Sequence, residues 1–135
     1  MRSLLLVIIF FLHAIFAATP VSVSHFKDVH ASLIKNNPQG IFDANKKTVI
    51  FIDIDSSLFE AGGSALADPE TISYINRWNT LGYNVAFFTN AAEGSRRVTQ
   101  ALQSIGMYQP HMFPIFFTDA QDKGEWLSNP ANADI

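Results

Sequence analysis

The segment VIFIDID, residues 49–55, constrains the fold more than any other part of the chain. Four apolar residues run directly into two acids that are separated by a single residue. A strand that is apolar on both faces is normally buried in a parallel sheet covered by helices. Acids at its carboxyl end lie at the edge where open α/β sheets bind their ligands. Residues 49–54 are therefore predicted to form a core strand, with Asp53 and Asp55 at a candidate site.

The rest of the chain alternates strand and helix in the same way. Further apolar strands are predicted over residues 83–89 and 115–117, while residues 56–67, rich in Gly, Ser and Ala, are expected to be a loop. A first helix is expected before residue 36. The second should begin at the cap Asp68, continue through Pro69 and stop at Gly82. Two more are expected from about Val98 to Gly106 and near residues 124–127. This order predicts an α/β fold, a Rossmann-like parallel sheet with flanking helices. Residues 132–135 resemble the start of a fourth strand, so we expect the core to be incomplete at its C-terminus.

Residues 1–18 are interpreted as a signal peptide. Arg2 precedes an apolar run over residues 4–12, and small residues then lead to Pro20. The mature α/β domain would span residues 19–135 and be secreted or periplasmic, without stable membrane association after cleavage. Two alternatives stay open. The apolar run approaches the length of about 20 residues that spans a bilayer, so an uncleaved N-terminus would anchor the chain, or the run forms a buried core helix.

Composition excludes several classes of partner and site. The 135 residues carry nine basic and twelve acidic side chains, a net charge of -3. Because no run of Lys or Arg is present to neutralise phosphates along a surface, no nucleic-acid partner is expected. The chain has no cysteine, which excludes disulfides and a thiolate zinc site. The length allows one small domain.

The carboxyl ends of neighbouring parallel strands converge, so the residues after each predicted strand should form one site. Asp53, at the strand tip, is placed to act as a nucleophile on phosphorus. Asp55 points to the same side of an extended chain and is a candidate acid and base. Thr89 offers a hydroxyl to a phosphate oxygen. After the third strand, Lys123 offers a positive charge.

Backbone groups are expected to assist this phosphate site. The amides of Asn90 and of residues 91–92 are expected at the head of the helix after the second strand, where N–H groups and the helix dipole favour anions. Simpler interpretations exist for each residue alone. Acids after a strand can be solvated loop residues, Thr89 is an ordinary strand residue, and Lys123 is an ordinary surface lysine.

Three motifs in this order resemble those of the haloacid dehalogenase (HAD) superfamily. VIFIDIDSSLF is similar to its first motif, an apolar strand ending in Asp-x-Asp. VAFFTN is similar to its second, and Lys123 in DKGE to its third. The chain is most similar in character to exported bacterial HAD-like proteins and acid phosphatases. The resemblance implies a Rossmann-like core and Mg²⁺-dependent hydrolysis of a small phosphomonoester through an aspartyl phosphate.

The resemblance also implies a role for each matching residue. Asp53 would be the nucleophile and a metal ligand, while Asp55 would be the acid and base and contact the metal through its main-chain carbonyl. Thr89 and Lys123 would hold the phosphate. The fourth motif, acids after a fourth strand that complete the Mg²⁺ site, has no counterpart before Ile135. We therefore expect the N-terminal part of a longer phosphohydrolase; the alternative is a catalytically degenerate HAD-like domain that binds a phosphorylated ligand or a protein partner.

Overall fold

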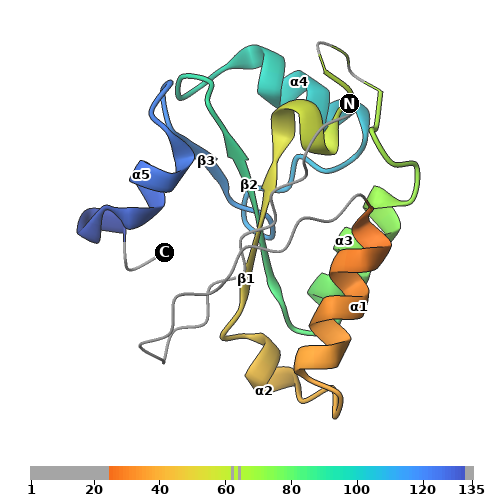
Figure 1. The fold of residues 1–135 in the computed structure, drawn as a ribbon. Coiled ribbons are helices and arrows are strands. Elements are labelled where there is room, and N and C mark those ends of the chain that lie inside the picture. The colour runs from red at the N-terminus through yellow and green to blue at the C-terminus, as the bar shows by residue number, and fades with distance from the viewer. Residues whose placement is uncertain (1–24, 62, 64, 133–135) are drawn as a thin grey trace.

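A computed structural model describes residues 25–61, 63 and 65–132, and the structural statements below concern these residues (Figure 1). Helices and turns alternate with three strands along the chain. In order, the elements are α1 (Phe26–Asn36), α2 (Phe42–Asn45), β1 (Val49–Asp53), the π-helical turn η1 (Ile54–Leu58), α3 (Thr71–Thr80), β2 (Asn84–Thr89), α4 (Arg96–Ser104), β3 (Ile115–Phe117), α5 (Lys123–Ser128) and the 3₁₀ turn η2 (Pro130–Asn132).

The three strands form one parallel sheet in the order β1-β2-β3. This confirms an α/β fold with a parallel sheet flanked by helices, consistent with a Rossmann-like core. The register pairs Asp53 with Phe88 and Thr89 with Phe117. Because all three strands run the same way and end nearly in line, the residues that follow them share one edge of the sheet.

The two faces of the sheet are covered differently. Alternate strand residues, including Ile52 of β1 and Phe87 of β2, face a large apolar cluster supplied by α1, α3 and α4. The intervening residues, including Phe51 and Phe88, form a smaller cluster with Trp126 of α5. Figure 1 shows α5 on the side of the sheet opposite α1 and α3. Burial on both faces explains why the strands are apolar at nearly every position.

Helix α1 is attached to the core through its aromatic and aliphatic side chains. Phe26 is 2% exposed and stacks on the fully buried Trp78 of α3 at a ring-centroid distance of 5.8 Å. The indole Nε1 of Trp78 donates a hydrogen bond to His30 Nδ1 at 3.2 Å, so the polar atom of this buried ring is satisfied. His30 is half-buried, as expected of a packing residue.

Helix α3 begins later than expected. Asp68, Pro69 and Glu70 form a turn in which the Asp68 side chain accepts the Glu70 backbone N–H at 2.9 Å, and the helix starts at Thr71. Its stop is as predicted, because Gly82 follows the helix with φ +96°. The predicted strands, the end of the helix expected before residue 36 and the bounds of the helix expected near residues 124–127 agree with the structure to within about two residues, the usual uncertainty of such bounds.

Several predictions fall outside the described residues. The proposed signal peptide over residues 1–18, and with it the anchor alternative, lies there. Within the described part of the chain, no helix has the length and apolar character needed to cross a membrane. Of the predicted fourth-strand start, Asn132 ends the turn η2, and residues 133–135 are not described.

Candidate functional site

The chain leaves β1 through a turn that places two acids at the edge of the sheet. Ile54, expected to end the strand, instead begins η1, whose closing bond runs from Phe59 N to Ile54 O at 3.1 Å. Ile54 and Leu58 are fully buried and fix this turn to the core. A π-helical turn is rare and frequently marks a functional site. Asp53 ends the strand and Asp55 lies in the turn, so the two carboxylates leave the backbone in different directions.

The segment predicted to be a loop, residues 56–67, is more ordered than expected. It contains most of η1 and then an antiparallel bridge between Phe59 and Leu66. Glu60 N donates to Ala65 O at 2.8 Å across the same hairpin. Phe59 is 3% exposed, so the base of the hairpin is anchored in the core.

Asp53 faces Lys123 in a partly buried pair. Asp53 Oδ1 lies 3.2 Å from Lys123 Nζ, and the two side chains are 28% and 22% exposed. Lys123 is the ion-pair partner of Oδ1, and within the described residues this buried oxygen has no hydrogen-bond partner by geometry. Burial raises the pKa of Asp53 from its ordinary value, and Lys123 opposes this shift only in part. Asp53 is therefore a carboxylate whose buried oxygen forms an ion pair with a cation but has no hydrogen-bond partner among the described residues.

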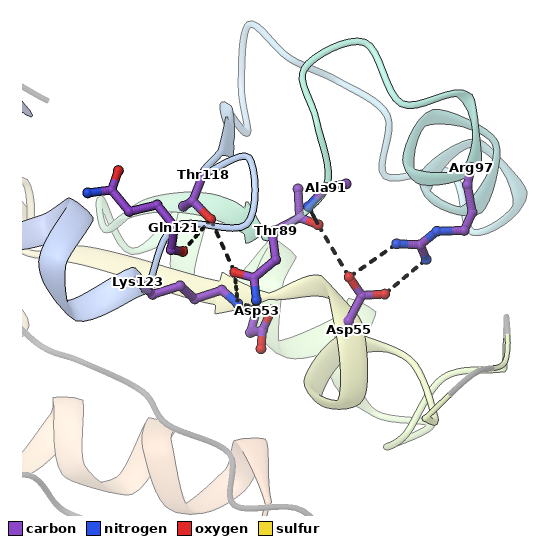
Figure 2. A network of polar contacts seen from close by, with 9 residues as sticks. Asp53, Asp55, Thr89, Ala91, Arg97, Thr118, Gln121 and Lys123 are labelled. Atoms are coloured by element: carbon purple, nitrogen blue, oxygen red, sulfur yellow. Dashed lines mark hydrogen bonds and ion pairs between the residues drawn. The ribbon is translucent and has the colours of Figure 1, made fainter.

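Lys123 is held in place by two segments. It is the first residue of α5, a helix capped by Asp122, which accepts the Glu125 N–H at 3.1 Å. Lys123 Nζ donates to Asn90 Oδ1 at 2.9 Å, and Thr118 Oγ1 lies 3.1 Å from the same oxygen. Figure 2 shows this chain of contacts beside Asp53. The amide of Asn90 thus directs the ammonium toward the acid.

The loop that connects β3 to α5 has an unusual backbone. Asp119 and Ala120 have φ of 48° and 64°, a region that residues other than glycine seldom adopt. Ala120 N donates to Asn90 O at 2.8 Å, and the buried Thr118 hydroxyl lies 2.9 Å from Gln121 O. These bonds hold the loop against the end of β2. Such a conformation persists only where its surroundings fix it, often at ligand sites.

Asp55 forms a second cluster on the other side of Thr89. Its Oδ1 accepts from Arg97 Nη1 at 2.9 Å, and its Oδ2 from Arg97 Nη2 at 3.2 Å and from Thr89 Oγ1 at 3.3 Å. Figure 2 shows the carboxylate turned toward Arg97 of α4. The hydrogen bonds and the charge of Asp55 raise the pKa of Arg97 further. Both oxygens of Asp55 are thus engaged.

All five predicted site residues lie at this edge of the sheet, in two clusters: Asp53, Asn90 and Lys123, and Asp55 with Thr89. Their contacts differ from the expected ones. Thr89 is fully buried, and its oxygen is shared by Asp55 and the Ala91 amide at 3.2 Å.

The prediction that residues 90–92 begin a helix was wrong. Helix α4 starts only at Arg96, after a turn in which Gly94 has φ +76°. The amides of residues 90–92 therefore belong to a loop and do not lie at the positive end of the helix dipole. The Ala91 amide is also already bonded to Thr89.

Two residues of the site were not identified from the sequence. Arg97 lies in the first turn of α4, 42 positions from Asp55, and an arginine on an exposed helix surface carries no signal that sets it apart. Thr118 follows β3 directly, where the convergence of strand ends could have indicated it.

The expected Mg²⁺ ligands fit a cation only in part. Asp53 supplies the carboxylate oxygen that Mg²⁺ prefers, and its buried Oδ1 has no donor. The Asp55 carboxylate is paired with Arg97, which leaves its main-chain carbonyl for the role that the resemblance implies. Among the described residues, no three His, Cys, Asp or Glu side chains come together to hold a metal. A cation here would keep most of its water ligands.

Comparisons of the chain with known families, with curated proteins and with solved structures found no match. The fold class thus stands on the structure alone, and the family remains a prediction from the three motifs.

Proposed function

We propose that the chain is the core of a HAD-like, Mg²⁺-dependent phosphohydrolase that cleaves phosphomonoesters through an aspartyl phosphate. One observation carries the proposal: Asp53 ends a buried strand with an oxygen that lacks a hydrogen-bond partner among the described residues, 3.2 Å from the ammonium of Lys123. A buried carboxylate oxygen without a hydrogen bond is costly to the fold, so its presence beside a cation favours a catalytic role over a structural one.

In this proposal, an oxygen of the Asp53 carboxylate attacks phosphorus as the bond to the ester oxygen breaks. The leaving oxygen keeps the bonding electron pair and takes a proton from the carboxylic acid of Asp55. In the second half, Asp55 takes a proton from water, whose oxygen attacks the phosphoryl group and releases Asp53 and inorganic phosphate. Lys123 offsets the negative charge that builds on the phosphoryl oxygens.

Mg²⁺ would be held by the Asp53 carboxylate and the main-chain carbonyl of Asp55, and when bound would supply further positive charge beside the phosphoryl group. Asn90 and Thr118 act through Lys123, whose ammonium they direct toward Asp53. Thr89 positions Asp55 in a similar way, since its hydroxyl donates a hydrogen bond to that carboxylate. Neither Thr89 nor Asn90 needs to touch the phosphate in this arrangement.

Turnover of para-nitrophenyl phosphate by the full chain and by Asp53→Asn tests the proposal. The substitution removes the nucleophile but keeps the size of the side chain, so we expect turnover to vanish. Asp119→Asn is the matched control, because it removes one acid from an exposed position of the neighbouring loop. An Asp53→Asn variant as fast as the parent would show that Asp53 is not the nucleophile.

A second candidate is a HAD-like domain that binds a phosphorylated ligand or a protein partner without catalysis. It is favoured by the engagement of both Asp55 oxygens with Arg97 and by the lack of a three-residue metal group among the described residues. Calorimetric titration with vanadate, which resembles the transition state of phosphoryl transfer, separates the two. Binding of vanadate without any turnover in Mg²⁺ would favour this second function.

A further inference from the structure

The position of the Asp55 carboxylate conflicts with its proposed chemistry. Each of its oxygens accepts a hydrogen bond from the guanidinium of Arg97, at 2.9 and 3.2 Å, and Thr89 adds a third donor. In Figure 2 the group is turned toward α4, while the carboxylate of Asp53 points toward Lys123. A carboxylate held in this way carries no proton and is turned away from an ester oxygen at Asp53. Proton transfer therefore requires that the two hydrogen bonds from the Arg97 guanidinium to Asp55 break first.

The ion pair between Arg97 and Asp55 can readily exchange one carboxylate for another anion. The side chains of Arg97 and Asp55 are 60% and 46% exposed, and ion pairs this accessible to water contribute little to stability. Arg97 also lies in the first turn of α4, a turn without acids where a cation opposes the helix dipole. An anionic partner offsets this unfavourable interaction, and the carboxylate or phosphate of a ligand can pair with both guanidinium N–H groups in the same way as Asp55.

We propose that Arg97 selects phosphomonoesters whose leaving group carries a second anionic group, and that this group takes the guanidinium from Asp55. The inference rests on the proposed function and deepens it by naming a substrate class. A carboxylate or second phosphate close to the ester oxygen replaces Asp55 on the fork. Asp55, released as a carboxylate, takes up a proton from the solvent once the guanidinium no longer pairs with it, turns to the ester oxygen, and donates that proton as the P–O bond breaks.

Two pairs of matched probes test this selection. Phospholactate and isopropyl phosphate differ only by a carboxylate in place of a methyl group, and kcat/KM is measured for both in the full chain. Phosphonoacetate and ethylphosphonate differ in the same way but are not hydrolysed, so calorimetry compares their binding. The variants are Arg97→Ala, Arg97→Lys, which keeps the charge but loses the fork, and Arg96→Ala, which removes the neighbouring exposed arginine.

We expect Arg97→Ala to lower kcat/KM for phospholactate by about 10- to 100-fold, the loss that follows removal of hydrogen bonds to a charged group. Isopropyl phosphate should be cleaved faster than by the parent, because Asp55 is no longer held. Arg97→Lys should fall between, and Arg96→Ala should change neither ester. The preference for phosphonoacetate over ethylphosphonate should be lost in Arg97→Ala.

The outcomes separate the inference from the function on which it rests. Equal losses for both esters would mean that Arg97 supports Asp55 or the fold, and would overturn the selection. A parent without preference for phospholactate and phosphonoacetate would overturn it as well. A parent that binds phosphonoacetate through Arg97 but hydrolyses neither ester would contradict the proposed hydrolysis while supporting the second-anion site.

Discussion

Replacing Asp53 by Asn should stabilise the fold at neutral pH. Burial raises the pKa of the Asp53 carboxyl despite the ammonium of Lys123 at 3.2 Å, so the folded state disfavours its negative charge. A buried acceptor without a donor costs about 1–3 kcal/mol, and more when it is charged, while a partly exposed ion pair returns about 0–1 kcal/mol. Asn keeps a neutral polar atom at this position, so only the part of the cost that belongs to the charge is recovered. The substitution should therefore raise the unfolding free energy by about 1 kcal/mol. For a domain of this size that corresponds to roughly 4 °C in Tm.

The pH dependence of this gain has a definite sign. Because the pKa of Asp53 is higher in the folded state than its ordinary value of 3.8, the folded state binds more protons between these two values. The unfolding free energy of the parent therefore falls as pH rises from 3.8 through the folded pKa. Asn does not titrate, so the advantage of the variant should be largest at neutral pH and disappear toward pH 3.8.

Urea unfolding of parent and variant from pH 7 down to pH 4 measures this difference, with Asp119→Asn as the control. Asp119 is exposed, so its replacement should change stability by less than about 0.5 kcal/mol at every pH. An Asp53→Asn variant that is less stable than the parent at pH 7 would refute the reasoning. The charge would then be fully compensated by Lys123, and the site would store no strain.

Three further predictions concern stability. Burial, and after it the charge of Arg77, lowers the pKa of His30, so the unfolding free energy should fall as the pH drops through 6.5. His30→Asn keeps an acceptor for the Trp78 indole but does not titrate, so urea titrations of this variant should show a flatter pH profile. Gly82→Ala should lower the unfolding free energy by about 1–2 kcal/mol, measured by thermal unfolding, because φ at this position is +96°. A smaller side chain at Phe42, which lies over Gly82, should restore little of this loss, since the half-exposed Phe42 ring can already move aside. Thr118→Val should cost about 0.5–1.5 kcal/mol and slow turnover through a displaced lysine; unchanged stability and turnover would argue against that bond.

The sheet could be predicted from the sequence because its strands are buried on both faces. The residues in β1 and β2 are apolar almost throughout, and β3 begins at Ile115 and ends at Phe117, as predicted. Gly82 gave the end of α3 correctly, because a position with positive φ favours glycine. The convergence of parallel strand ends brought the five candidate residues to one edge, as expected.

The local geometry of the site could not be predicted in the same way. A π-helical turn has no sequence signature, so Ile54 was assigned to the strand. The apolar face of α4 from Val98 is predicted correctly, but the amides of residues 90–92 are not at its head, because nothing except Gly94 marks residues 90–95 as a separate turn. Arg97 reaches Asp55 only through the tertiary packing of α4, which periodicity does not report.

The most direct test of the central claim is to locate the covalent intermediate. The full chain is incubated with para-nitrophenyl phosphate and Mg²⁺, quenched in acid, digested and examined by mass spectrometry. The account predicts a phosphoryl group on Asp53, which is absent from Asp53→Asn and accumulates in Asp55→Asn, where water activation is slow while this good leaving group still departs. Turnover without any label on Asp53, or with a label on another residue, would contradict it.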